Sequence, residues 1–328
     1  MKKATEIKNA YEVLKGNETN WAEAIANIDW GLNRICQLAG SGICSWCPNT
    51  KKNKPEDEIL MSDVTVARIC DQLAEAGYKG QISLNRYNEP FVLGKALADK
   101  IALIRSYLPE NRIGINTNGF LVTKELLKAV YTAGLSSMNF QLYPVTRQEE
   151  EEFTFEWALA KAQKFCHKLG LEIDDIKTKR VDGFYYEFSI ILPSEWATLW
   201  GTPSMTMYAK RLTKLGCDRG GTVSALKCTQ RQERCPQIGH FLAIDADGNC
   251  SPCTNCTGKL LGINSHEAMI LGNVKDTPLS EIFARIEPQR RALNEEFSAE
   301  SLEKYSICKH CSFIPHVAQM NRLAEGTL

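Results

Sequence analysis

Short apolar runs alternate with amphipathic segments along most of the chain. The helical pattern is clearest over 62–78, where apolar residues recur on one helical face, Ser62 is a suitable N-cap and Gly77 a suitable C-terminal stop. Such alternation predicts parallel strands joined by right-handed crossover helices. The predicted strands are 28–35, 81–85, 112–116, 137–142, 185–192 and a short run at 221–226, and further helices are predicted over 89–108, 123–134 and 147–170.

These repeats predict an α/β protein. About six strand–helix units are fewer than the eight of a closed barrel, so we expect a partial (β/α)6 barrel. The pattern then changes, because cysteines lie in loops rich in Gly, Pro, Asn and Asp around a short strand in "HFLAIDADG", 240–248. We therefore divide the chain into an N-terminal helical extension (1–27), the partial barrel (28–226) and a cysteine-rich C-terminal domain (227–328).

Charge and composition exclude several classes of function. Lys+Arg and Asp+Glu balance at 39 each, without the basic blocks that nucleic-acid binding requires. The sequence shows neither the apolar core of a signal peptide nor an apolar run of about 18 residues. We expect a cytoplasmic protein without nucleic-acid or membrane partners. In that compartment, thirteen cysteines indicate metal or redox chemistry rather than disulfides.

Three cysteines, Cys36, Cys44 and Cys47, follow the first predicted strand in "GLNRICQLAGSGICSWCPN". They lie at the edge where parallel α/β folds place their chemistry. A structural zinc site normally has four ligands, and no nearby His or Cys completes this set. Three thiolates suit a cubane iron–sulfur cluster whose fourth iron stays open for a ligand from a substrate or cofactor.

The three cysteines, with aromatic Trp46 before the third, resemble the signature of radical S-adenosylmethionine (SAM) enzymes. Most members have three residues between the first two cysteines, whereas this chain has seven, 37–43. "SLNRYNEP" and "GINTNG" resemble segments of the family that contact SAM at successive strand ends, although each Asn or Gln there is also an ordinary turn residue. The resemblance implies SAM contacts from Trp46, Asn88, Glu89, Asn116 and Asn118, and from Gln141 at the end of "MNFQL".

A second cysteine pattern lies in the C-terminal part. Cys235 is followed by twelve residues, Gly248, four residues and Cys253, and "CKHC" later supplies Cys308 and Cys311. This pattern resembles the SPASM/twitch extension of radical SAM enzymes, which binds auxiliary 4Fe–4S clusters. Because no cysteine follows Cys311, the resemblance implies a twitch form with one auxiliary cluster bound by these four cysteines.

Two alternatives remain open for this pattern. Cys250 and Cys256 lie close enough in sequence to replace Cys253 as a ligand. Two distant cysteine pairs are also typical of a zinc ribbon, and a zinc-stabilised binding module without catalysis would carry them. By contrast, Cys70 and Cys166 fall on apolar helical faces, and we expect them in the core.

Membership of this family implies specific cofactors and partners. The cofactors are two 4Fe–4S clusters, one of which binds SAM, and SAM itself; the partners are a small-molecule substrate and a reductant of the flavodoxin or ferredoxin type. In the family, SAM is cleaved to methionine and a 5′-deoxyadenosyl radical, which abstracts an unactivated hydrogen atom while the protein binds and orients.

The layout with one auxiliary cluster also resembles that of the aminocyclitol and sugar dehydrogenases and epimerases of the family, which act at a carbinol carbon. "KLGCDRGGTVS" is similar to their Asn-Arg-x-Gly stretch and implies that Arg219 binds a substrate hydroxyl. The neighbouring Cys217 is either a buried structural cysteine or a hydrogen donor that inverts the carbon. We therefore expect an epimerase. Dehydrogenation, with the auxiliary cluster accepting an electron, and peptide or amino-acid modification are the alternatives.

Overall fold

The computed structural model describes residues 20–39, 47, 58–144, 146–177, 183–215, 223, 231–232, 234–235, 237–256, 269–309 and 311. Its strands are β1 (Asn27–Trp30), β2 (Gln81–Ser83), β3 (Ile113–Thr117), β4 (Ser137–Gln141), β5 (Glu172–Lys177), β6 (Tyr185–Ile191), β7 (Ser204–Lys210), β8 (Phe241–Ile244), β9 (Asn249–Ser251) and β10 (Gly272–Asn273). They form a single sheet in the order β10-β9-β8-β1-β2-β3-β4-β7-β6-β5.

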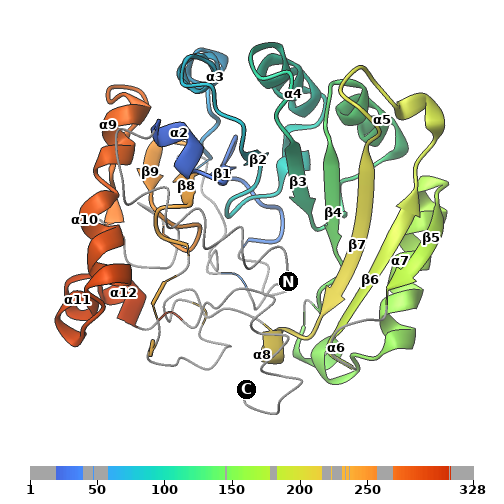
Figure 1. The fold of residues 1–328 in the computed structure, drawn as a ribbon. Helices are drawn as coiled ribbons and strands as arrows, with labels where there is room; N and C mark the ends of the chain where they lie inside the picture. Colours follow the sequence, from blue (N-terminus) through green and yellow to red (C-terminus); the bar gives the residue numbers. More distant parts are fainter. Residues whose placement is uncertain are drawn as a thin grey trace.

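The described residues also form eleven α-helices. They are α2 (Trp21–Ala24), α3 (Asp63–Glu75), α4 (Ala96–Tyr107), α5 (Lys124–Thr132), α6 (Arg147–Glu151), α7 (Phe155–Leu169), α8 (Leu212–Leu215), α9 (Leu279–Ala284), α10 (Glu287–Arg290), α11 (Ala299–Lys304) and α12 (Ser306–Lys309). Shorter turns are the 3-10 helices η2 (Pro90–Leu93) and η3 (Ser194–Trp196) and the π-helix η5 (Arg291–Glu295). Figure 1 shows α3, α4 and α5 on the outer side of the curved sheet, and α9 to α12 near β8 and β9.

The centre of the sheet is parallel, as the alternation of strands and helices predicted. Neighbours β8, β1, β2, β3, β4 and β7 all pair in parallel. The strands predicted at the start of the chain are confirmed at β1 to β4, and the sheet ends at β5 and β10 without closing. The partial α/β barrel is therefore confirmed.

The strand predicted over 185–192 is present as β6, but its parallel pairing was wrong. β6 runs antiparallel to β7, and β5 runs antiparallel to β6. The reason is the connection, because only the short turn η3 lies between β6 and β7, whereas a parallel pair needs a long crossover. Neither β5 nor β7 was predicted. The predicted run 221–226 lies outside the described residues except for Val223.

The single helix predicted over 147–170 is two helices, α6 and α7. Thr154 adopts an extended conformation between them, and its hydroxyl accepts a hydrogen bond from the Trp157 backbone N–H. An N-cap of this kind starts a new helix and contributes about 1 kcal/mol. Gly170 then ends α7 in the left-handed conformation, at φ 62°.

The predicted C-terminal strand "HFLAIDADG" joins the same sheet. Its β8 pairs in parallel with β1, so Ile28 lies beside Leu242. β9 and β10 continue the sheet by antiparallel pairing. The sheet therefore passes without interruption from the predicted barrel segment into the predicted C-terminal segment, and the division of the chain into three segments stays a prediction.

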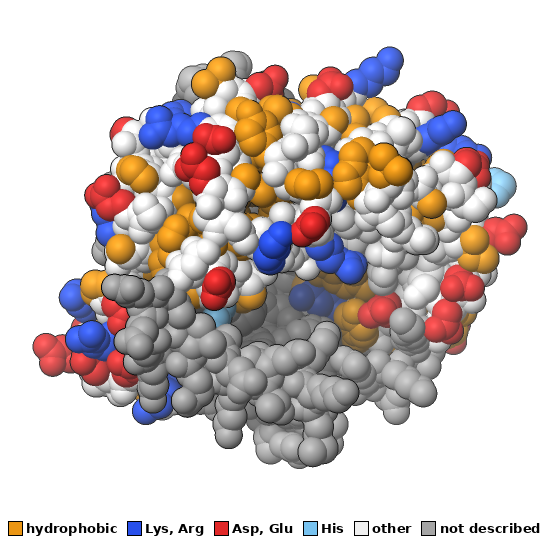
Figure 2. Space-filling model, turned by 45° about the horizontal axis from the view of Figure 1, so that its top comes forward, with side chains coloured by type: hydrophobic (Ala, Val, Ile, Leu, Met, Phe, Trp, Pro, Cys, Tyr) orange, Lys and Arg blue, Asp and Glu red, His pale blue; other side chains and the backbone are white. Residues whose placement is uncertain are grey.

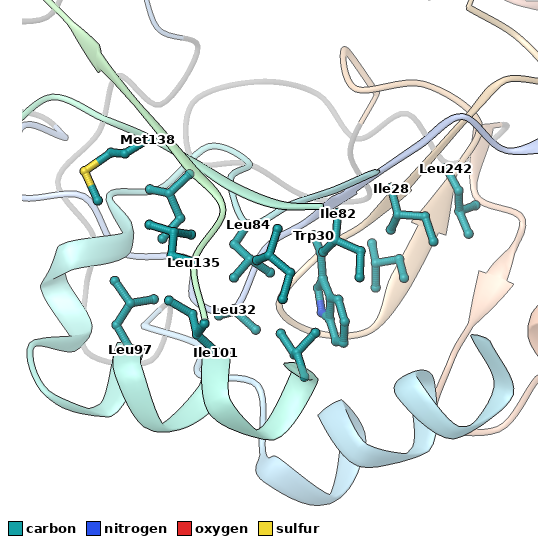
Figure 3. Close-up of a cluster of buried hydrophobic side chains, with 14 of the residues drawn as sticks. Ile28, Trp30, Leu32, Ile82, Leu84, Leu97, Ile101, Leu135, Met138 and Leu242 are labelled. Carbon is teal, nitrogen blue, oxygen red and sulfur yellow. The ribbon is translucent and has the colours of Figure 1, made fainter. Parts of the chain in front are cut away.

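The main core lies between the sheet and the outer helices. Figure 3 shows Ile28, Ile82 and Leu242 from adjacent strands in one cluster with Leu97 and Ile101 of α4. Each fully buried side chain of this size contributes about 1.5–3 kcal/mol. The two cysteines predicted to be in the core are confirmed there, and burial raises the pKa of Cys70 to about 12 and that of Cys166 to about 11.

The opposite face of the sheet is polar. Side chains alternate between the two faces of a strand, so Ile115, Met138 and Met207 are buried on the helix side while their neighbours point the other way. The pairing register places polar residues of adjacent strands side by side on this inner face. They are Asn116, Asn139, Thr206 and Ser189 in one row, and Gln141, Tyr208 and Glu187 in the next.

Charges are distributed evenly over the part of the surface that Figure 2 shows. Basic and acidic side chains are interspersed there, in agreement with the balanced composition of the chain. Among the described helices, none is both long and apolar enough to cross a membrane.

Candidate functional site

Glu89 joins the ends of two strands. It stands before η2, is 1% exposed, and its carboxylate accepts hydrogen bonds from Phe91 N (3.1 Å), Thr117 Oγ1 (2.8 Å) and Asn118 N (2.9 Å). Burial raises the pKa of Glu89, and these hydrogen bonds partly oppose that effect. The carboxylate therefore holds the loop after β2 against the end of β3. The SAM contact predicted for Glu89 stays a prediction.

The predicted Asn and Gln side chains meet along the same edge. Asn139 donates to the side-chain oxygen of Asn116 (3.0 Å), and Asn116 donates to that of Asn85 (3.2 Å). In the next row, Gln141 of β4 donates to the Tyr208 hydroxyl of β7 (3.2 Å). Amide groups from the end of β2 to β4 thus form one polar row on the inner face, and the Gln141–Tyr208 pair lies in the next row.

Asn88 has a buried donor that fits a bound ligand. Its side-chain oxygen accepts from Arg86 N (2.9 Å), while its Nδ2 is buried without a hydrogen-bond partner among the described residues. An unsatisfied buried donor costs about 1–3 kcal/mol. An acceptor oxygen of a ligand such as SAM would satisfy it.

The first cysteine loop approaches these residues. The carbonyl of Ile35 accepts from Glu89 N (2.8 Å), and the side chain of Gln37 donates to that of Asn118 (3.1 Å). Cys36 therefore lies between two residues, Ile35 and Gln37, that hydrogen-bond to residues predicted to contact SAM. Gln37 begins the unusual seven-residue spacing, and its contact gives one part of that spacing a structural role. Cys44 and Trp46 lie outside the described residues.

The second group of cysteines lines a hollow that is partly open to solvent, with Arg231 and Asn255 also in its wall. Among the described residues no three Cys, His, Asp or Glu side chains are arranged to hold a single metal ion. The sulfurs instead surround the hollow, an arrangement that suits a group with several metal atoms. The cysteines in the wall are Cys235, Cys253, Cys256, Cys308 and Cys311.

Hydrogen bonds around the hollow support thiolate ligands. The backbone N–H of Asn255 lies 3.4 Å from Cys253 Sγ, and the side-chain amide of Asn255 lies 3.8 Å from Cys311 Sγ. A hydrogen bond from Cys256 lowers the pKa of Cys253, whereas burial raises the pKa of Cys235 to about 11. N–H groups directed at sulfur are how proteins adjust iron–sulfur clusters, so the residues present fit such a group.

The structure separates the alternatives that the spacing left open. Cys250 lies in β9, where its thiol contacts the Gly248 carbonyl at 3.8 Å, and it takes no part in the hollow. Cys256 does face the hollow, beside Cys253. The fold thus offers five cysteines for the four positions of one 4Fe–4S cluster.

A tyrosine-rich group lies on the inner face at β6 and β7. The Tyr185 hydroxyl donates to Glu187 Oε2 (2.9 Å), and the Tyr208 ring lies between those of Tyr143 and Tyr185, with centroid distances of 5.5 and 6.3 Å. Sequence reasoning missed Tyr208 because it missed β7, although the alternation in "SMTMYAK" was the available signal. Cys217 and Arg219 lie outside the described residues.

Comparison with known proteins agrees with this arrangement. Residues 235–312 match the SPASM family, an iron–sulfur cluster-binding domain, and no curated protein sequence matches the chain. The fold is similar to BtrN in complex with AdoMet and 2-DOIA, with a TM-score of 0.59 and 18% identity over 88% of this chain and 94% of BtrN. BtrN in an open conformation has a TM-score of 0.53 and 17% identity, over 88% of this chain and 93% of that one.

A third structure, anSMEcpe with bound AdoMet, has a TM-score of 0.45 and 12% identity, over 92% of this chain and 96% of that one. The domain match coincides with the cysteine-lined hollow, and the fold match covers 88% of the chain. The chain thus shares the fold of BtrN, and its residues 235–312 match an iron–sulfur cluster-binding domain of the SPASM family; both findings agree with the resemblance seen in its two cysteine groups.

Proposed function

We propose that this chain is a radical SAM enzyme that acts on a carbinol C–H of a sugar-like or aminocyclitol substrate, free or nucleotide-linked, and epimerises that carbon. The observation that carries the proposal is a convergence at one edge of the sheet. Ile35 and Gln37, on either side of Cys36, hydrogen-bond there to Glu89 and Asn118, and the polar inner face begins beside them.

Cofactor binding follows from these residues. The SAM-binding cluster would be held by Cys36, Cys44 and Cys47, and together with SAM it would supply the radical that removes a hydrogen atom from an unactivated carbon. Asn88 offers a buried amide donor to the bound SAM, and Glu89 keeps the strand ends in place around it. The auxiliary cluster would be held by Cys235, Cys253, Cys308 and Cys311.

The inner face supports a substrate rich in hydroxyl groups. Tyr185 and Glu187 provide a phenol and a carboxylate, and Gln141 adds an amide, all on the same side of the sheet. Such groups exchange hydrogen bonds with hydroxyls and amines. We assign substrate hydroxyl binding at the domain junction to Arg219, whose planar donors suit paired oxygens.

Epimerisation requires a hydrogen donor on the opposite face of the carbon, and we assign this role to Cys217. The carbon loses one hydrogen atom and gains another as the S–H bond of Cys217 breaks. The sulfur radical then returns to a thiol by taking one electron and one proton. We expect the electron from a flavodoxin- or ferredoxin-type reductant.

Turnover in deuterated water tests this reaction. One solvent deuterium in a product of inverted configuration supports epimerisation, because a thiol exchanges its proton with solvent. A carbonyl product without deuterium would show dehydrogenation instead. Cys217→Ala should still cleave SAM yet lose inversion, while Cys166→Ala, in the core of α7, serves as a matched control and should retain it. Unchanged inversion in Cys217→Ala would reject that donor.

Dehydrogenation of the same substrate class is the second candidate. It is favoured by the cysteine-lined hollow, because an auxiliary cluster there would accept the electron that the substrate radical releases as it becomes a carbonyl. Loss of the substrate hydroxyl proton would complete that oxidation. Measuring whether one carbonyl group forms for each 5′-deoxyadenosine distinguishes it from epimerisation.

A further inference from the structure

Arg86 connects the two cofactor regions directly. It follows β2, two residues before Asn88, and its side chain is 3% exposed. The guanidinium donates to Asp245 Oδ1 through Nε (2.9 Å) and Nη2 (2.8 Å), to the Thr254 carbonyl (2.8 Å) and to the Cys256 carbonyl (2.5 Å). The last two acceptors lie 168 and 170 residues away in sequence, within the loop that carries Cys253.

The surroundings of Arg86 allow little movement. Tyr87 also donates to the Thr254 carbonyl (3.2 Å), and Gly31 of the strand end leaves room for the arginine stem. A Cβ at Gly31 would lie 3.1 Å from Cγ of Arg86, closer than ordinary van der Waals contact. The Ser251 hydroxyl also contacts the carbonyls of Cys253 and Cys256. The loop 253–256 is thus held by Arg86, Tyr87 and Ser251.

Only an arginine suits these contacts. The planar guanidinium presents five donors in a fixed fork, which here reach one carboxylate and two carbonyls at once. A lysine would bring its charge to one point and reach fewer of them. A buried ion pair is also weak evidence for a role in stability alone, because its desolvation offsets most of the attraction.

We propose that Arg86 is a positioning residue for the auxiliary cluster. It fixes the cysteine loop 253–256 to the strand end that bears Asn88 and Glu89, and it places a buried positive charge beside that loop. The inference rests on the proposed function to the extent that it requires an auxiliary cluster. Residues that orient metal ligands contribute about 10- to 100-fold to metal affinity, and nearby charges and hydrogen bonds set cluster potentials.

The test uses the full chain with Cys36→Ala, Cys44→Ala and Cys47→Ala, which removes the SAM-binding cluster and leaves the auxiliary one. After anaerobic reconstitution, this background should hold about four irons per chain. We would measure iron, acid-labile sulfide, the rate of iron transfer to a chelator and the midpoint potential followed by electron paramagnetic resonance.

In this background, Arg86→Gln should weaken iron retention about 10- to 100-fold and lower the midpoint potential, because a positive charge that favours the reduced cluster is lost. Arg86→Lys should weaken retention with a smaller change of potential. Arg34→Gln is the matched control, because Arg34 Nη2 pairs with Oδ2 of Asp247 (2.5 Å), two residues after Asp245. This variant should leave iron retention and the midpoint potential unchanged.

A double variant without an unpaired buried charge distinguishes loss of the positioning role from misfolding. Arg86→Met with Asp245→Leu removes both charges without leaving one buried alone, a replacement that often preserves stability. It should also weaken iron retention. If iron retention and the midpoint potential are the same in all Arg86 variants as in the background, the inference is overturned. A background without iron and sulfide would instead reject the auxiliary cluster, and with it the proposed function.

Discussion

The two cysteine groups of this protein differ in how the chain assembles them. Cys36 and Cys47 belong to one loop after β1 and are partly exposed. The cysteines of the second group come from distant parts of the sequence and are all buried around one hollow. A cluster that binds a substrate or cofactor must leave one position accessible, whereas an auxiliary cluster with four protein ligands can be enclosed by the fold. This difference in exposure fits the proposed roles, which are SAM binding at the first cysteine group and electron transfer at the second.

The largest expected effect is on the open site. Cys36→Ala should abolish SAM cleavage and remove about four irons per chain, because the cluster loses one of its three ligands. Anaerobic purification, iron analysis and detection of 5′-deoxyadenosine measure this. Wild-type protein that is colourless and holds zinc without sulfide would contradict the assignment of iron–sulfur clusters to both cysteine groups.

The enclosed site should respond differently. Cys308→Ala should also remove about four irons but retain SAM cleavage without product, since the open cluster remains. Cys250→Ala is the control, because Cys250 lies outside the hollow, and it should keep all the iron. Loss of iron in Cys250→Ala, or full iron in Cys308→Ala, would show that the ligands are assigned wrongly.

A smaller effect is expected at Glu89, which holds the open site together. Burial raises its pKa in the folded protein, so the folded state binds the proton more tightly than the unfolded state. This contribution to stability is present at low pH and is lost as the pH rises from the unfolded pKa, near 4.5, through the raised folded pKa. Glu89→Gln should flatten that dependence.

Glu89→Gln should also cost about 1–3 kcal/mol at neutral pH, because the amide group of Gln opposes one of the N–H donors that Glu89 accepts. Thermal unfolding of the protein without cofactors between pH 4 and 8 measures both effects. Thr123→Ala, an N-cap on α5 away from the site, is a control that should lower stability without changing its pH dependence. A pH profile identical to wild type would exclude this role for Glu89.

The smallest effect on chemistry is expected from a cysteine outside both groups. Cys70→Ser places a hydroxyl at a fully buried, apolar position of α3. It should lower the free energy of unfolding by about 1–3 kcal/mol and leave iron content and SAM cleavage unchanged. Chemical denaturation and iron analysis check this, and any loss of iron would mean that Cys70 takes part in a cluster.

Much of the site was predictable because it depends on local order. Glu89 and Asn118 follow predicted strands and Asn116 ends one, and parallel strands bring their ends to one edge of the sheet. The roles of Cys256 and Arg86 were not predictable. Their contacts join segments more than 150 residues apart, and no periodicity reports which of two nearby cysteines faces a hollow.

The sequence by itself determined β1 to β4, their helices and the two cysteine patterns, because apolar periodicity and residue spacing are local properties of the chain. Only the tertiary structure decided that β7 lies between β4 and β6, that β8 extends the sheet from β1, and that Cys250 is excluded from the hollow. The physical reason is that strand pairing and the direction of a loop side chain are set by packing against residues distant in sequence, which the local pattern does not contain.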